Sequence, residues 1–366
     1  MKTYREGDEA MPPSKGYRSY RGRGSKLKVA LAVVLVLIIL LALSFMAMTR
    51  YIAYDEDGMP FFRLPPQEET EAPPPAAGKE DLTGDIQIEE PPDIIIQGPE
   101  RPLPLFAFSL PQELLTAETW EAALAAHGEP YDTVVYTVKD ADSTAYFATE
   151  NAIPGLVRRA KEATTEALAA MNGSELHTVA RLTCFHDFKT ANANREDMGL
   201  KNTGGYIFYD GTYTTWLDPA KPAARAYLQA MAVELAGLGF DEILLTEVSY
   251  PTEGKLDKIA YTADGPLHVD IELFLQELRA ALEGYEITLS IELPEKVITE
   301  GQDDTAGLRL KGVIPYVDRI YARTAPETAE ALREAVEEAG EKVSFVPELA
   351  EAPAEGFDET GYLVLS

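Results

Sequence analysis

Apolar residues follow two different patterns along this chain, and each predicts a different part of the protein. From Val29 to Met48 the sequence reads VALAVVLVLIILLALSFMAM, with no charged residue. A helix of that length rises by about 30 Å, which is the thickness of the hydrocarbon core of a membrane. A cleaved signal peptide has only ~7–15 apolar residues, followed by a small-residue cleavage site, and no convincing site follows here. We therefore expect a retained transmembrane helix over residues 29–48.

From residue 105 onward, short apolar segments alternate with amphipathic ones. Strands are predicted at Leu105–Leu110, Thr133–Lys139, Thr178–Phe185, Glu242–Val248, Glu286–Leu293, Arg319–Arg323, Lys342–Leu349 and Gly361–Ser366. Helices are predicted at Ala117–His127, Pro154–Met171, Ala223–Leu238, Val269–Leu282, Leu308–Tyr316 and Pro326–Ala339. Such alternation requires parallel pairing, and eight units in about 260 residues match a (β/α)8 TIM barrel. The alternative is an open doubly wound sheet, but no Gly-rich phosphate loop follows Leu110. The eighth helix is missing from the pattern.

The flanks of the apolar stretch predict the orientation of the protein. Residues 1–28 form a basic tail, whereas Asp55, Glu56 and Asp57 follow soon after the stretch. The positive-inside rule keeps this tail in the cytoplasm and exports everything after the membrane span. Residues 49–104 are rich in Pro, Glu and Asp, which predicts an extended extracellular linker. We therefore expect a single-pass protein of the cell membrane, with a barrel over residues 105–366 outside the cell.

Charge and composition restrict the partners. The chain carries a net charge of −29, and because the first 50 residues carry +6, the remainder carries −35. Such a surface repels nucleic acid and is compatible with a neutral ligand such as a glycan. Cys184 is the only cysteine, and the four histidines lack metal-ligand spacing, so neither disulfides nor a structural zinc site is expected. No cofactor fingerprint is present.

Polar residues gather where the predicted strands end. In a barrel, catalysis takes place at this carboxyl-terminal face, and alternation with period two predicts which side chains point inward. In the fifth strand the inward set is Thr288, Ser290 and Glu292, with Glu292 at the mouth. The same alternation predicts further inward-pointing side chains, which include those of Lys139, Arg181, Tyr321, Arg323 and Glu348. Packing alone does not require such a polar ring.

A mouth rich in carboxylates and aromatic rings favours sugar chemistry. Hydrolysis of a glycosidic bond normally uses two carboxyl groups, one as general acid and one as nucleophile or base. The catalytic candidates are Glu292, Glu247, Asp140 and Glu348, while composition alone would also place carboxylates in surface loops. The long segment from Asp187 to Thr215 is predicted to form an ordered flap or hairpin. Its Tyr206 and Tyr209, with Trp216, would stack on sugar rings, whereas Phe208 fits packing equally well.

Several segments, in order, resemble a known family. They are VVYTVKDADSTAYF, VARLTCFHDF, WLDPAKPAARAYL, LGFDEILLTEVSYP, SIEL and GQDDTAGL. Together they are similar to the "putative glycosyl hydrolase domain" of bacterial membrane-anchored or exported proteins. The resemblance covers roughly residues 105–325, and it implies a (β/α)8 barrel related to glycoside hydrolases. It also implies functional positions at Lys139, Asp140, Arg181, Trp216, Asp218 and Glu292.

The fourth strand departs from the family pattern. Where the family usually has F-D-Y-V-R-F-P, this chain has Leu245–Pro251, so that Thr246 replaces the acid and Ser249 the arginine. Glu247 is adjacent, but alternation points it away from the barrel unless a bulge turns it inward. Two hypotheses follow. The first is a glycoside hydrolase acting on extracellular or cell-wall glycan. The second is a barrel without catalysis that binds glycan or a partner protein.

Overall fold

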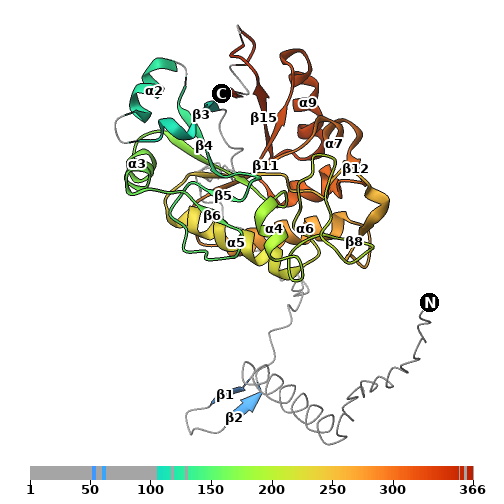
Figure 1. Cartoon of the computed structure of the whole chain (residues 1–366). Helices are drawn as coiled ribbons and strands as arrows, with labels where there is room; N and C mark the ends of the chain where they lie inside the picture. Colours follow the sequence, from blue (N-terminus) through green and yellow to red (C-terminus); the bar gives the residue numbers. More distant parts are fainter. Residues whose placement is uncertain are drawn as a thin grey trace, which may run out of the picture. The chain divides into compact units, whose positions relative to one another are not determined.

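The computed structural model in Figure 1 describes residues 105–116, 119–127, 131–353, 355–357 and 361–365, and the strands at 52–54 and 60–62. The chain divides into two compact units, Met1–Glu90 and Pro91–Ser366. In the first unit, β1 (Ile52–Tyr54) pairs antiparallel with β2 (Pro60–Phe62). The predicted tail, the transmembrane span and most of the linker lie outside the described residues. Within the described part, no helix is long and apolar enough to span a bilayer.

Eight parallel strands form a closed barrel in the second unit, which confirms the predicted fold class. In pairing order they are β3 (Leu105–Leu110), β4 (Thr133–Lys139), β7 (His177–Thr183), β9 (Glu242–Thr246), β11 (Thr288–Glu292), β14 (Arg319–Arg323), β15 (Ser344–Leu349) and β16 (Gly361–Val364). The last strand pairs with the first, Tyr362 opposite Phe106, and β3 pairs with β4. Because the ring closes, an open doubly wound sheet is ruled out. Two short strands, β5 (Thr144–Ala145) and β6 (Val157–Arg158), extend the sheet from β4.

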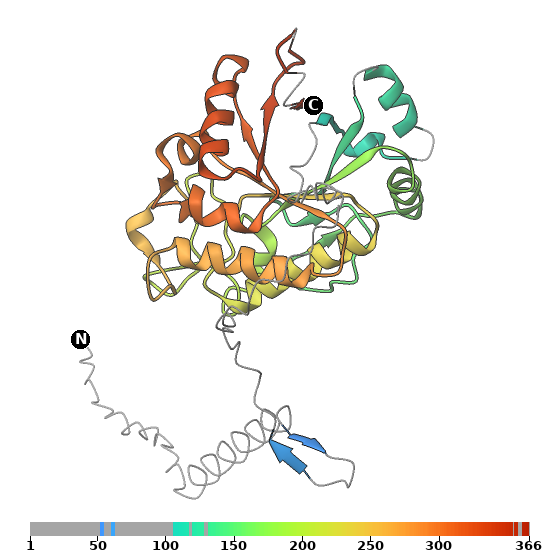
Figure 2. The same ribbon diagram turned by 180° about the vertical axis from the view of Figure 1, so that it is seen from behind.

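Helices occupy the connections between the barrel strands and surround them (Figures 1 and 2). The longer ones are α2 (Trp120–His127), α3 (Glu162–Asn172), α5 (Pro222–Gly237), α6 (His268–Ala281) and α9 (Pro326–Ala339). The predicted helix from Pro154 begins only at Glu162, because β6 occupies part of that stretch. The sequence pattern missed two short helices, α4 (Phe188–Ala193) and α7 (Glu295–Glu300). The helix predicted at Leu308–Tyr316 is present as α8 (Leu310–Val313) followed by the 3-10 helix η3 (Ile314–Tyr316). Between β15 and β16 the described residues form no helix.

Buried side chains form two separate groups, one on each side of the barrel wall. The larger group lies between strands and helices and includes Leu289, Ile291 and Leu293. The smaller group fills the inside of the barrel and consists of Leu105, Ala107, Val135, Val179, Leu244, Tyr321, Val346 and Leu363, with Leu365 against it. The alternation predicted for β11 is therefore confirmed, since its apolar residues face the helices.

Glu242, at the start of β9, organises a polar floor inside the barrel. Its carboxylate accepts hydrogen bonds from Ser290 Oγ at 2.6 Å and Tyr321 Oη at 2.8 Å, and it pairs with Arg319. His177 Nε2 lies 2.9 Å away. Burial opposes the charge of Glu242, but His177 and Arg319 outweigh it and lower the pKa. Tyr321 points inward as predicted, yet it is fully buried in this floor and cannot reach a substrate.

Candidate active site

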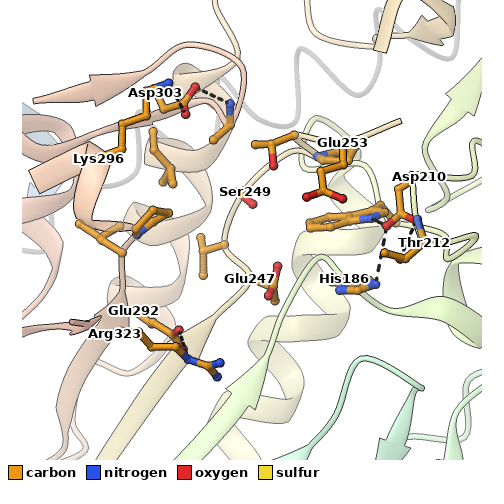
Figure 3. A pocket seen from close by; sticks show the side chains of 18 residues that line it. His186, Asp210, Thr212, Glu247, Ser249, Glu253, Glu292, Lys296, Asp303 and Arg323 are labelled. Carbon is orange, nitrogen blue, oxygen red and sulfur yellow. Dashed lines mark hydrogen bonds and ion pairs between the residues drawn. The ribbon is translucent and has the colours of Figure 1, made fainter. Parts of the chain in front are cut away.

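A cavity of about 560 Å³ lies at the carboxyl-terminal ends of β9, β11 and β14 (Figure 3). Strand ends contribute Glu247, Glu292 and Arg323 to its wall. The loops after β7, β9 and β11 contribute the other charged or titratable side chains, which are His186, Asp210, Glu253, Lys296 and Asp303. This is the position expected for a site in a barrel of this kind.

Glu247 reaches the cavity through an unusual backbone conformation. Strand β9 ends at Thr246, and Glu247 adopts φ = +53°, in the left-handed region that non-glycine residues rarely occupy. The backbone there is held by the residues that directly follow β7, because Cys184 N–H donates to Thr246 O at 2.9 Å and Phe185 N–H to Glu247 O at 3.1 Å. Strain of this kind costs about 1–3 kcal/mol and is concentrated at functional sites. A left-handed turn, rather than the bulge considered from the sequence, therefore directs the Glu247 side chain inward.

Glu292 lies beside Glu247 in the cavity and is held by two arginines. Arg181 Nη2 donates to Glu292 and, at 3.1 Å, to Glu348 Oε2. Arg323 Nε lies 3.3 Å from Glu292 Oε1 and 3.6 Å from Glu348 Oε2. Because Arg323 Nε contacts both side chains, Glu292 Oε1 and Glu348 Oε2 cannot be farther apart than the sum of these two nitrogen–oxygen distances. Glu292 and Arg323 line the cavity, whereas the Glu348 side chain has no exposed surface.

The two glutamates nearest Glu292 both have raised pKa values. The pKa of Glu247 is raised by loss of hydration inside the cavity and by the nearby charge of Glu292, although Arg323 and Arg181 oppose this. Burial raises the pKa of Glu348 to about 7, with Glu292 adding to the rise and Arg181 opposing it. Glu247 therefore holds a proton at a higher pH than an ordinary glutamate, and it is also accessible to solvent. These are the properties of a general acid.

We expect Glu348→Gln to change the pH dependence of stability. Glu348 has a pKa of about 7 in the folded chain against an ordinary value of 4.5, so between these two values the unfolded chain releases a proton that the folded chain keeps. Wild-type stability therefore falls as pH rises through this window, and the variant escapes the fall. Relative to wild type, its free energy of unfolding should rise by about 2–3 kcal/mol from pH 4.5 to 8. Denaturant unfolding at both pH values measures this, with exposed Glu351→Gln as control. Parallel pH curves for the Glu348 variant and wild type would contradict it.

A histidine, a tryptophan and an aspartate form another wall of the cavity. The rings of His186 and Trp216 stack with centroids 4.5 Å apart and planes 1° apart, and Trp216 Nε1 donates to Asp210 Oδ2 at 2.8 Å. Burial opposes the charge of Asp210, but hydrogen bonds from Trp216 and Thr214 lower its pKa to about 2. Burial lowers the pKa of His186, which favours the neutral ring. This wall therefore carries the negative charge of Asp210.

Comparison with known families identifies the domain. Residues 116–328 match the family described as "putative glycosyl hydrolase domain". The chain belongs to this family. The matched range includes strands β4 to β14 and the cavity between their ends.

A solved structure with a similar fold is known. The glycoside hydrolase domain of PgaB (BpsB) from Bordetella bronchiseptica is similar over 72% of this chain and 94% of its own, at 14% identity and a TM-score of 0.50. That likeness concerns the fold. A hypothetical protein from Ruminiclostridium thermocellum is 25% identical over 50% of this chain and 96% of its own, with a TM-score of 0.43. Among curated proteins, nothing matches this chain.

Lys139 does not follow the predicted alternation, and the reason is a β-bulge. The register between β4 and β7 shifts between Thr137 and Lys139, so that Lys139 pairs with Leu182, a residue of the outer core. Its ammonium group lies 2.9 Å from Asp187 Oδ2 and donates to Thr183 O at 2.7 Å, and both charged side chains have no exposed surface. Lys139 is therefore a buried partner of Asp187, and the inward orientation predicted for it is wrong.

Two aspartates of the family pattern lie in turns away from the cavity. Asp140 accepts hydrogen bonds from Thr144 N at 2.9 Å and Tyr146 Oη at 2.8 Å, which holds the turn after β4. Asp218 is buried and accepts from Thr262 Oγ1 at 2.6 Å and Ala220 N at 3.1 Å, just before α5. Neither lines the cavity, because both carboxylates are used to fix local backbone.

The long segment after β7 is ordered, as predicted, and contains α4 and β8 (Lys201–Asn202), which pairs with β10 (Ile259–Ala260). Its aromatic residues separate into different environments. Trp216 lines the cavity, Phe208 is buried in the outer core, and Tyr206 is 70% exposed outside the cavity. Tyr209 lines a second, smaller hollow. The predicted wall of stacked rings is therefore reduced, at this cavity, to Trp216.

Sequence reasoning missed the acidic residues that the loops bring to the cavity. Asp210 and Glu253 belong to separate connections, after β7 and after β9, and no motif marks either. Asp303 also lines the cavity, where it pairs with Lys296 at 2.9 Å. The only available signal was the unusual length of the β7 connection. Among the described residues, no group of three or more potential ligands is placed to hold a metal ion.

Proposed function

We propose that this protein is a membrane-anchored glycoside hydrolase acting on extracellular or cell-wall glycan, with Glu247 and Glu292 as its carboxylate pair. The observation that carries the proposal is the left-handed turn at Glu247, because it directs this carboxyl group into the cavity that Glu292 also lines. Family membership supports a glycan-acting barrel. The apolar stretch Val29–Met48 supports the anchor, with the basic tail in the cytoplasm and the barrel outside the cell.

The environments of the two carboxyl groups suit opposite roles. Glu247 has a raised pKa, so it serves as the general acid that donates a proton to the glycosidic oxygen as the bond to the sugar breaks. Glu292 pairs with Arg181 and Arg323, which stabilise its negative charge. Its carboxylate serves as the nucleophile or base that completes the substitution at the anomeric carbon. Glu348 is buried behind them and acts as a positioning residue for Arg181.

The role of Glu247 as general acid can be tested with two substrates whose leaving groups differ in their need for a proton. Glu247→Gln should lower kcat/KM by at least about tenfold on a natural oligosaccharide, whose leaving alcohol needs a proton, and much less on a nitrophenyl glycoside, whose phenolate leaves without one. Because the acid must be protonated, wild-type activity should fall as pH rises through the raised pKa of Glu247, and the variant should lose this alkaline limb. Hydrolysis of cell-wall fragments and plain oligosaccharides measures both effects.

Exposed Glu334→Gln on α9 carries the same charge change away from the cavity and should match wild type. If Glu247→Gln lowered kcat/KM equally on both kinds of substrate, Glu247 would not be the general acid.

The second candidate function is that of a barrel that binds glycan without cleaving it. It is favoured by Thr246, whose hydroxyl lies 3.3 Å from that of Thr183 at the position of the family's acid. Glycan binding with no turnover on any tested substrate would support this candidate instead.

A further inference from the structure

The buried ion pair between Lys139 and Asp187 has no part in the chemistry proposed above, yet Asp187 directly follows His186, which lines the cavity. Lys139 Nζ donates to Thr183 O at 2.7 Å and lies 2.9 Å from Asp187 Oδ2. One ammonium group therefore holds both ends of residues 183–187, the segment that begins at the last residue of β7. Hydrogen bonds from a charged donor in a water-free interior are stronger than those between neutral groups.

The Asp187 end of this segment is fixed from a second side. Ser143 Oγ donates to Asp187 Oδ1 and accepts a hydrogen bond from the backbone N–H of Lys189 at 2.7 Å. Lys139, Ser143 and Asp187 are all fully buried. Because water cannot replace these contacts, loss of the ammonium group would leave the Thr183 carbonyl and one Asp187 oxygen without compensation.

The middle of the same segment carries the turn of Glu247. Cys184 N–H donates to Thr246 O at 2.9 Å, and Phe185 N–H donates to Glu247 O at 3.1 Å. Glu247 has φ = +53°, a conformation that persists only where the surrounding structure holds it. Since the backbone sets the direction of the Cα–Cβ bond, the contacts that hold this backbone also aim the Glu247 carboxyl group into the cavity (Figure 3).

These contacts form a continuous chain from Lys139 to the proposed general acid. We propose that Lys139 is a positioning residue: its ammonium group clamps residues 183–187, and that segment holds Glu247 in the turn that aims its carboxyl group at the substrate. Lys139 does not itself touch a substrate, because its side chain is fully buried. The inference rests on the proposed glycosidase function and adds a residue to its machinery. It also gives a reason for a buried ion pair, since such pairs add little net stability once their charges are dehydrated.

The test uses a variant that loses the clamp without leaving a buried charge behind. Lys139→Met combined with Asp187→Asn removes both charges together, which disturbs the fold less than the lysine change alone. The matched control is Arg279→Met combined with Asp318→Asn, which breaks an ion pair of 2.7 Å at the opposite end of the barrel, just before β14. There Asp318 Oδ2 also accepts from the backbone N–H of Leu289 at 2.9 Å, so both pairs hold strand backbone. Neither variant changes the net charge of the chain.

Hydrogen exchange of the full-length proteins, followed by mass spectrometry, measures the clamp without any substrate. In the Lys139/Asp187 variant, peptides that contain the amides of Cys184 and Phe185 should exchange at least about tenfold faster than in wild type. Peptides that contain Leu293, whose N–H donates to Tyr321 O at 2.8 Å just beyond β11, should not change. The control variant should leave both regions at wild-type rates. Unchanged exchange at residues 184 and 185 would overturn the inference.

Kinetics then show whether the clamp serves the acid. The Lys139/Asp187 variant should lower kcat about tenfold on a natural oligosaccharide and less than about threefold on a nitrophenyl glycoside, with KM little changed. Release of the turn lets water reach Glu247, so that its pKa falls toward the ordinary value and the alkaline limb of activity moves down by roughly 0.5–1 pH unit. The other charges that act on this pKa are unchanged in the variant, namely those of Glu292, Arg323, Arg181 and Asp210.

Three kinetic outcomes would overturn the positioning role. Equal losses on the two substrates, with the alkaline limb in place, would reflect a general loss of structure and would leave the glycosidase proposal intact. A raised KM with unchanged kcat would also leave that proposal intact and would place Lys139 in substrate binding. If the wild-type protein cleaved none of the tested glycans, the proposed function would fail, and the positioning role with it.

Discussion

Replacing Glu292 with Gln is expected to lower kcat on a cleavable glycan by a factor of about 10²–10⁴. The carboxylate faces the cavity from the end of β11, with Glu247 in the same cavity, and it contacts both Arg181 and Arg323. Gln keeps the size of the side chain and can still accept a hydrogen bond, but it provides no negative charge to attack the anomeric carbon or to activate water. The loss should therefore appear in kcat more than in KM.

Steady-state hydrolysis of the same oligosaccharides by wild type and variant measures this effect. Exposed Glu300→Gln, at the end of α7, removes a charge from the same connection without touching the cavity and should leave kcat unchanged. Thermal unfolding of Glu292→Gln separates lost chemistry from lost folding, because the variant also removes one partner of the largely buried Arg181. Unchanged turnover in the folded variant would remove Glu292 from the catalytic pair.

Lys139→Met is expected to destabilise the fold by about 3–5 kcal/mol, the largest effect on stability that we predict. Lys139 and Asp187 form an ion pair at 2.9 Å with neither side chain exposed. Removal of the ammonium group leaves an uncompensated carboxylate inside the protein, next to the turn in which Ser143 Oγ also donates to Asp187. Methionine retains most of the volume, so the loss reports charge rather than packing.

Denaturant unfolding measures the loss, and Lys311→Met on the exposed face of α8 is the matched control, for which a change within about 0.5 kcal/mol is expected. Adding Asp187→Asn to Lys139→Met should recover part of the stability, because the buried charge is then removed. The kinetic parameters of the folded fraction provide a further check. A variant with wild-type stability and a raised KM would instead assign Lys139 to substrate binding.

The sequence alone was sufficient to predict features that depend on residues close to one another along the chain. Alternation with period two identified which residues of β11 face the helices, and it placed Glu292 and Arg323 at the mouth. The number of apolar segments gave the barrel, because eight parallel strands with crossovers between them close on one another. The same pattern failed at Lys139, where one extra residue in β4 shifts the register, and no local feature of TVVYTVK signals the bulge.

Only the tertiary structure decided which residues join Glu292 and Arg323 in the active site. Glu247 turns inward because Cys184 and Phe185, just after β7, hold the backbone of residues 246 and 247 in hydrogen bonds that permit a positive φ. Asp210 and Glu253 become neighbours because two glycines let separate loops touch. The local pattern of a chain reports which face of its own strand or helix a residue occupies. The direction of a side chain beyond the strand end, and the loops that meet there, depend on contacts between segments distant in sequence. These contacts form only when the barrel closes.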